Sequence, residues 1–253
     1  MIETNLTKKT VLVTAAGREP GRSICLALCK NRAKVIACDE DLQAAKSTAQ
    51  ILKNLGGQAA YYQFNVNKKQ ELYRLADTII LEQGEIDILV NSEKETLKES
   101  ERKLTHEMNM DRYFAVYDRE LEGLYFTSKA FLRHMVKNKG GIVINITSVL
   151  GLVPKKGMIA NAAMAAATMS LSRVWALELD KDNVRVHCIA RGCLPEEDAL
   201  NEQEIIHQSI KRQITSEDVA NAVLYCASDE AQAENGGILT VDGGLHYGYM
   251  RNF

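Results

Sequence analysis

Residues 10–22, which read TVLVTAAGREPGR, decide the fold class. They join an apolar, β-branched run at Thr10–Thr14 to a glycine-containing turn, after which Arg22–Asn31 shows helical spacing of apolar residues. β-Branched residues favour strands, and an apolar period of about 3.6 residues favours an amphipathic helix. A strand, a glycine turn and a helix in this order indicate the start of an α/β domain, with the turn where a phosphate-binding loop would stand.

The same alternation continues to the end of the chain. Short β-branched runs predict seven strands, at Thr10–Thr14, Lys34–Cys38, Tyr61–Val66, Ile86–Asn91, Gly141–Thr147, Val184–Ala190 and Gly237–Val241. Helical spacing covers Arg22–Asn31, Leu42–Leu55, Lys69–Gln83, Met108–Asn138, Met158–Leu179 and Glu217–Ser228. Several strands are apolar on both faces, which indicates a parallel sheet covered by helices on each side. We therefore predict a single Rossmann-like domain over residues 1–253, with a doubly wound, seven-stranded parallel sheet.

The composition excludes several classes of protein. The 253 residues are 46% hydrophobic and 25% charged, which excludes a disordered or collagen-like chain. The formal net charge of −2 gives no basic surplus for binding nucleic acid or anionic membranes. The longest apolar runs, such as Ile142–Ile146, are far shorter than a membrane span, and the N-terminus lacks an apolar signal region. We therefore expect a cytoplasmic protein without a nucleic-acid or membrane partner.

The cysteine and histidine patterns predict neither a redox site nor a metal site. The six cysteines lie in apolar runs without a C-x-x-C pair, so we expect buried free thiols. The five histidines are scattered, without H-x-x-x-H or H-E-x-x-H spacing. Zinc sites and metalloprotease sites depend on such spacings, so we expect no metal.

Two stretches interrupt the alternation of strands and helices. Ser92–His106 holds eight acidic or basic residues and is typical of a solvated loop or surface helix. Gly192–Gln213 contains a proline, an acidic triplet and an amphipathic fragment. Because segments that leave the carboxyl ends of strands build the ligand crevice of a doubly wound fold, we predict a lid at 192–213. An aromatic C-terminal tail follows at 245–253.

Taken together, the motifs resemble the short-chain dehydrogenase/reductase (SDR) family. They are the glycine turn at 14–21, IDILVN at 86–91, GIVINITSVLG at 141–151, VRVHCIARG at 184–192 and a segment at 217–244 that ends in GGILTVDGG. Their order and spacing resemble the family along essentially the whole chain. The resemblance implies an oxidoreductase that uses a nicotinamide dinucleotide, and it assigns roles to particular positions.

The resemblance places the family's T-G-x-x-x-G-x-G loop at 14–21, where two of the three glycines are missing. Ala15 and Glu19 stand at the first two glycine positions. A Cβ at Ala15 crowds a pyrophosphate, and at about 5 Å and an effective dielectric of about 20 the Glu19 carboxylate repels it by about 3 kcal/mol. The glycines that remain are Gly17 and Gly21, and the cations that can offset the repulsion are Arg18 and Arg22. We expect an impaired site that binds NAD weakly or not at all.

Other positions that the resemblance assigns to the cofactor are better preserved. Asp39 ends the second predicted strand, where an acid accepts hydrogen bonds from ribose hydroxyls and disfavours the 2′-phosphate of NADP. Its interpretation as a helix N-cap or a solvated loop acid stays open. Asn65 and Val66 stand where the family has Asp-Val beside the adenine, and Asn91 ends the fourth strand. If a cofactor binds here, we expect NAD.

The catalytic positions depart furthest from the family. In the family a serine ends the fifth strand, a tyrosine on the next helix exchanges the proton, and a lysine one turn later lowers the tyrosine pKa. Counting thirteen and then four residues on from Ser148 gives Asn161 and Ala165. An amide cannot supply a proton near neutral pH and a methyl group carries no charge, so Ser148 is left as a vestigial catalytic residue. Glu120 stands where a family asparagine supports a proton-relay water.

A second tyrosine pattern is a decoy. Tyr125–Lys129 reads YFTSK and matches the family's Y-x-x-S-K by letter. It precedes the strand of Ser148 instead of following it, so we expect a packed helix there.

We therefore expect a non-catalytic subunit of a hetero-oligomeric, NAD-dependent SDR, with a tetramer as the expected assembly. A homologous active subunit would carry NAD and oxidise a secondary alcohol, for which an acyl-CoA of the 2-(hydroxybenzyl)succinyl-CoA type is a candidate. Two alternatives stay open. One is an active NAD-dependent alcohol dehydrogenase with rebuilt acid/base groups, such as Glu120 or a lysine at 155–156. The other is a sensor that binds a dinucleotide or an acyl-CoA without turnover.

Overall fold

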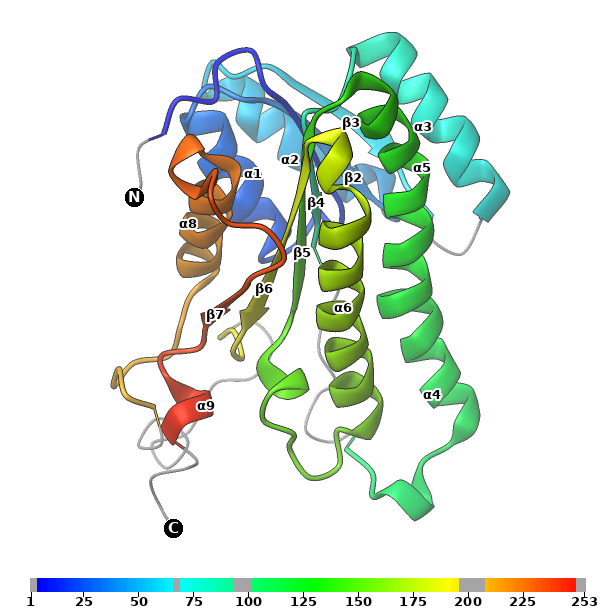
Figure 1. Cartoon of the computed structure of the whole chain (residues 1–253), viewed down its shortest axis with the longest axis vertical. Helices are drawn as coiled ribbons and strands as arrows, with labels where there is room; N and C mark the ends of the chain where they lie inside the picture. The colour runs from blue at the N-terminus through cyan, green and yellow to red at the C-terminus, as the bar shows by residue number, and fades with distance from the viewer. Residues whose placement is uncertain (1–3, 66–68, 93–101, 196–207, 249–253) are drawn as a thin grey trace.

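The computed structural model describes residues 4–65, 69–92, 102–195 and 208–248. Within these residues, seven parallel strands form one sheet in the order β3-β2-β1-β4-β5-β6-β7, with helices on both faces (Figure 1). The strands are β1 (Thr10–Val13), β2 (Lys34–Asp39), β3 (Ala59–Gln63), β4 (Ile88–Asn91), β5 (Gly141–Ser148), β6 (Val184–Arg191) and β7 (Ile238–Val241). The predicted doubly wound α/β fold is therefore confirmed.

Helices cover the two faces of the sheet in two layers. On one face pack α1 (Gly21–Lys30), α2 (Leu42–Asn54) and α8 (Ser216–Ala227), and on the other α3 (Lys69–Gln83), α5 (Gly123–Asn138) and α6 (Ile159–Glu178). Because side chains alternate along a strand, β1 supplies both cores: Val11 and Val13 face the first layer and Leu12 faces the second. The strands are therefore apolar on both sides, as the sequence predicted.

Two predicted elements differ in their bounds. The strand predicted at Tyr61–Val66 begins earlier, because β3 pairs with β2 from Val35↔Ala59 to Asp39↔Gln63. The helix predicted at Met108–Asn138 is not continuous. It consists of α4 (Met110–Val116), a π-helical turn over Tyr117–Glu122 and then α5. A π-helical turn inserts extra backbone into one turn and is frequent at functional sites. Here it carries Glu120.

The segment predicted as a lid is described only at its two ends. Residues 196–207 lie outside the described part of the chain, as do 93–101 of the charged stretch and 249–253 of the tail. The carboxyl end of the segment predicted as a lid contacts the turn between β7 and α9 (Leu245–Gly248), where the Ile210 N–H donates to the Gly243 carbonyl at 2.9 Å. None of the described helices combines the length and apolar character that crossing a bilayer requires.

Candidate functional site

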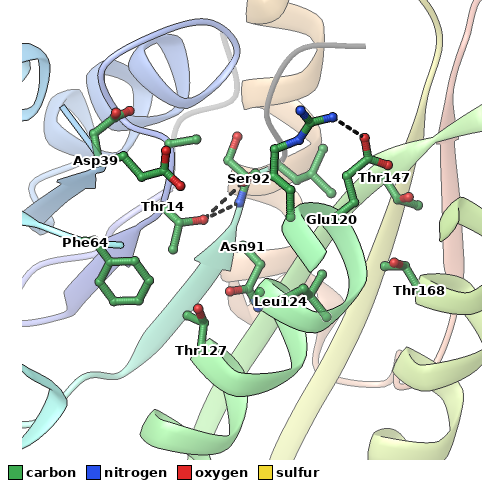
Figure 2. A pocket seen from close by; sticks show the side chains of 15 residues that line it. Thr14, Asp39, Phe64, Asn91, Ser92, Glu120, Leu124, Thr127, Thr147 and Thr168 are labelled. Atoms are coloured by element: carbon green, nitrogen blue, oxygen red, sulfur yellow. Dashed lines mark hydrogen bonds and ion pairs between the residues drawn. The ribbon is translucent and has the colours of Figure 1, made fainter. Parts of the chain in front are cut away.

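A pocket opens at the carboxyl ends of β1, β4 and β5, where the order of the strands reverses along the sheet. Ligands of doubly wound folds bind at this reversal. The space between its walls, counted with the part open to solvent, is about 610 Å³. Figure 2 shows Asp39 and Phe64 on one side of the pocket and Glu120, Thr147 and Thr168 on the other.

In the turn between β1 and α1, Ala15 adopts a backbone conformation that favours glycine. Ala15 lines the pocket and has φ +48°, a left-handed conformation that glycine adopts far more easily. Gly21 packs directly on this turn, since a Cβ there would lie 2.3 Å from the Ala15 carbonyl oxygen. A Cβ on Gly17 would lie 2.4 Å from the Cβ of Ala44 in α2. The two retained glycines therefore have packing reasons to be glycine.

Three backbone donors in the first turn of α1 are paired within the chain. The Glu19 carboxylate accepts the Ser23 N–H at 3.1 Å, and the N–H groups of Arg22 and Ile24 donate to main-chain carbonyls at 2.8 and 3.0 Å. Pro20 has no N–H to offer. A helix N-terminus attracts an anion through its unpaired N–H groups, and here a carboxylate of the chain itself accepts one of them. These residues do not fit a pyrophosphate.

Asp39 is buried to 1% exposure and accepts hydrogen bonds from the chain on both carboxylate oxygens. Its Oδ2 accepts the Gly17 N–H and its Oδ1 accepts the Asp41 N–H, each at 3.0 Å. The N-cap of α2 is Asp41, which accepts the Gln43 N–H at 2.8 Å. Asp39 is therefore neither a helix N-cap nor a solvated loop acid, so these two interpretations from the sequence are wrong. Its role toward a ribose stays a prediction.

Of the other positions that the sequence assigned to the cofactor, Asn91 lines the pocket and Asn65 does not. Asn65 is half-buried and is not among the residues that line the pocket, and Val66 lies outside the described residues. Asn91 lines the pocket at the end of β4 and also holds the fold together. Its Nδ2 donates to Ser128 Oγ at 2.9 Å and to Asn145 Oδ1 at 2.8 Å.

A chain of buried hydrogen bonds continues from Asn91 behind the pocket. Asn145 is fully buried in β5, and its Nδ2 donates to Ser172 Oγ in α6 at 2.9 Å. The Ser172 hydroxyl in turn donates to the Thr168 carbonyl at 2.8 Å. This chain of two amides and a hydroxyl, Asn91–Asn145–Ser172, which we call the amide chain, therefore links β4, β5 and α6 through the interior.

Ser148 acts as a helix N-cap at the end of β5. Its Oγ accepts the Leu150 N–H at 3.2 Å and so caps a short helical turn at Val149–Gly151. That turn presses on α6, since a Cβ on Gly151 would lie 2.7 Å from the Ala166 nitrogen. Ser148 is not among the residues that line the pocket, whereas Thr147 is.

The structure brings Glu120 and Asn161 together. Asn161 Nδ2 donates to Glu120 Oε1 at 3.2 Å, and the Arg119 guanidinium also donates to this oxygen, at 3.1 Å. Asn161 and Ala165 are each 2% exposed, and the Glu120 side chain is 11% exposed. The Glu120 carboxylate therefore lies between an amide and a guanidinium on this side of the pocket.

Sequence reasoning missed several pocket residues. Thr127 lies inside the YFTSK decoy, and Thr168 lies on α6 beyond Ala165. A threonine on a helix carries no signal of its own that separates a pocket wall from an ordinary buried position. The decoy tyrosine lies on α5 and is 36% exposed, with the centroid of the Tyr125 ring 6.2 Å from that of Trp175.

Among the residues the structure describes, no cluster of three His, Cys, Asp or Glu side chains could hold a metal ion. The cysteines are free, and all except the half-buried Cys193 are buried. Burial raises the pKa of the Cys226 thiol to about 12, so this thiol stays protonated at neutral pH.

A family model and curated relatives match most of the chain. The family described as short chain dehydrogenase matches residues 9–204. The chain is 32% identical over 244 residues to the 7alpha-hydroxysteroid dehydrogenase of Escherichia coli K12, covering 93% of each chain. It is also 32% identical over 248 residues to the 3-oxoacyl-[acyl-carrier-protein] reductase of Synechocystis, covering 96% of this chain and 98% of that reductase.

A solved structure extends the likeness to the fold. The crystal structure of a 3-oxoacyl-[acyl-carrier protein] reductase from Brucella melitensis with bound NAD superposes with a TM-score of 0.88 at 27% identity. The match covers 96% of this chain and 93% of that one.

Proposed function

This chain belongs to the short-chain dehydrogenase family, and we propose that within it the chain is a non-catalytic subunit of a hetero-oligomeric, NAD-dependent dehydrogenase. A homologous active subunit binds NAD and oxidises a secondary alcohol, and the two kinds of subunit form a tetramer in the cytoplasm. The chain supplies structural support or regulation to that partner.

The observation that carries the proposal is the pair of buried side chains on α6. Asn161 and Ala165 follow Ser148 at the spacing of the family's tyrosine and lysine, and both are only 2% exposed. The Asn161 amide is held by Glu120, and a buried methyl group at Ala165 leaves the site without the cation that would stabilise a phenolate. Proton exchange with an alcohol is therefore left to the partner subunit.

The start of α1 supports the assignment of NAD to the partner. The Glu19 carboxylate already accepts a backbone N–H of the helix, at the place where a pyrophosphate would bind. A bound dinucleotide would have to displace this carboxylate or lie beside its charge. We therefore assign this chain weak NAD binding at most.

For the partner's substrate we propose an acyl-CoA alcohol of the 2-(hydroxybenzyl)succinyl-CoA type, a compound of anaerobic toluene degradation. This assignment rests on the resemblance of the chain alone, so it takes second place to the subunit role.

One observation favours an active enzyme as a second candidate. Glu120 lines the pocket with a carboxylate that can accept a proton, and Thr147 offers a hydroxyl on the same wall. In that case Glu120 acts as the general base for an alcohol. A dinucleotide or acyl-CoA sensor would use the same pocket without turnover.

Co-purification tests the leading proposal. The tagged chain is isolated from its native host under mild conditions, and its partners are identified and counted by native mass spectrometry. We expect a stoichiometric homologue whose sequence has tyrosine and lysine at the positions of Asn161 and Ala165. A homotetramer without such a partner would contradict the proposal.

The isolated chain is assayed in parallel with NAD and a panel of secondary alcohols that includes 2-(hydroxybenzyl)succinyl-CoA. We expect no turnover above background. Turnover that Glu120→Gln abolishes, with folding unchanged by circular dichroism, would instead establish the active enzyme.

A further inference from the structure

A second cleft lies at the edge of the sheet where the strands begin. Its walls are the first residues of β1 and β2, the turn before β3 and the ends of α1 and α2. Because the strands are parallel, this edge is opposite the one that carries the pocket of Asp39 and Glu120 (Figure 1). The cleft is open to solvent and holds about 820 Å³, a volume within the range of small-molecule sites.

The side chains that line this cleft include four cations and no acid. The cations are Lys8, Lys30, Arg32 and Lys34. Within the described part of the chain none of the four is in a salt bridge, whereas the neighbouring Lys9 Nζ lies 3.5 Å from Asp87 Oδ1. The carboxyl ends of α1 and α2 each contribute about half a negative charge, which leaves the cleft a surplus of about three positive charges. An anion therefore matches the cleft.

Two of the four cations stand at backbone positions that suit glycine. Lys8 has φ +68° and Arg32 has φ +69°, and this left-handed conformation is disfavoured for any residue with a Cβ. Residues held in such conformations are frequent at ligand sites, where the side chain has a use that outweighs the strain.

The two helices that end at the cleft make this comparison direct. In each helix the second residue after the end is left-handed, and the next N–H donates to a carbonyl five positions back, at 3.1 Å after α1 and 3.0 Å after α2. Glycine is the usual residue at this position of a helix end. Helix α2 has Gly56 there, but α1 has Arg32. The helix end itself therefore does not explain the arginine.

The kinds of cation present favour phosphate as the anion. A guanidinium offers paired N–H donors that match two oxygens of a phosphate, and ammonium groups add charge to such a contact. The exposed amide of Gln58 lies in the same lining and can donate as well. Four cations exceed what a single phosphate group needs, so we expect a ligand with at least two.

We propose that this cleft binds a small molecule that carries two or more phosphate groups. Such a ligand would join the ends of α1 and α2 to the start of β1 and so stabilise this part of the sheet. The cleft is separate from the pocket at the carboxyl ends of the strands, so the proposal holds whether or not the chain serves as a non-catalytic subunit.

Isothermal titration of the full chain at 0.15 M salt tests the proposal. The probe is inorganic pyrophosphate, which has no base that could bind elsewhere, and the comparison is citrate, a carboxylate of similar charge. We expect pyrophosphate to bind at least about fivefold more tightly than citrate and to raise the melting temperature. The proposal is overturned if pyrophosphate does not bind at millimolar concentration, or if citrate binds as tightly.

A double variant locates the site. Lys8→Gly combined with Arg32→Gly removes two cations and relaxes both left-handed residues. The melting temperature of the ligand-free chain should stay the same or rise, whereas the affinity for pyrophosphate should fall about tenfold or more. A purely structural role of these residues predicts the reverse: a lower melting temperature with the affinity unchanged.

The matched control is Lys156→Gln combined with Lys181→Gln. These exposed lysines do not line the cleft, so the same loss of charge should change the affinity less than about twofold. If both double variants weaken binding equally, the effect is one of net charge and the site is refuted. Lys30→Gln changes a cation of the cleft at a regular helical position, and it should weaken pyrophosphate about threefold even if the glycine variants unfold. Unchanged binding in Lys30→Gln would place the ligand elsewhere.

Discussion

Replacing Gly21 by alanine tests whether the glycine that opens α1 is required by packing or by a ligand. In the structure a Cβ at this position would lie 2.3 Å from the Ala15 carbonyl oxygen and 2.9 Å from its carbonyl carbon. Both atoms belong to the main chain, and Ala15 already has the unfavourable φ of +48°. The turn cannot rotate a side chain out of the way, so either the helix or the turn must shift.

The expected loss of stability follows from this contact. Overpacking a closely packed site costs about 1–3 kcal/mol, and a clash with main-chain atoms belongs at the upper end of that range. For a chain of this size, about 1 kcal/mol lowers the melting temperature by roughly 2–4 °C. Gly21→Ala should therefore lower the free energy of unfolding by about 3 kcal/mol and the melting temperature by roughly 6–12 °C, in the absence of any nucleotide.

Gly140→Ala provides the matched control. The nearest atom to a Cβ there is Asn183 Nδ2 at 3.9 Å, and the backbone is not left-handed. This variant should be neutral or slightly stabilising, by up to about 1 kcal/mol through the unfolded chain. Urea and thermal unfolding of both variants are followed by circular dichroism. If Gly21→Ala unfolds within a degree of the unmodified chain, the packing argument is wrong and the glycine is retained for a ligand.

Three further variants probe the interior. Burial and the adjacent Arg185 lower the pKa of His187 from 6.5 to about 4. Because the unfolded chain then takes up the proton first, up to about 3 kcal/mol of stability should be lost as the pH falls from about 6.5 to 4. In the variant His187→Gln, the urea midpoint of unfolding should depend less on pH across this window. Asn161→Ala should cost about 2 kcal/mol in urea unfolding by removing a hydrogen bond to a carboxylate, and much of this cost should vanish in a Glu120→Ala background. Asn145→Ala should cost about 3 kcal/mol by leaving buried partners unpaired, with faster amide hydrogen exchange in β5.

The sequence predicted the sheet well because its signals are local. β1 and β2 are short β-branched runs bounded by turn residues, and their pairing needs no information beyond the doubly wound rule. The predicted bounds of β3 began too late in the sequence. Its first residues, Ala59 and Ala60, have a weak strand preference and enter the sheet only by pairing with β2. Pairing of this kind depends on the neighbouring strand, which a local pattern does not contain.

The candidate site was less predictable. Glu19 was expected to repel a phosphate, but that its carboxylate would cap α1 depends on a side-chain rotamer. The helical spacing of apolar residues continues through the π-helical turn at Tyr117–Glu122. The sequence therefore predicted one long helix there. The hydrogen bond between Glu120 and Asn161 joins residues 41 positions apart, so only the packing of two helices could reveal it.

The buried amide chain also has a consequence for α6 as a whole. This helix buries small and large side chains in alternation, so sliding it by one turn would bring Met164 to the place of Ala160 and Met169 to the place of Ala165. The bond from Asn145 to Ser172 adds a directional polar contact to this register. The hydrogen bond and the pattern of side-chain sizes together fix the register of α6, and this register keeps Asn161 opposite Glu120.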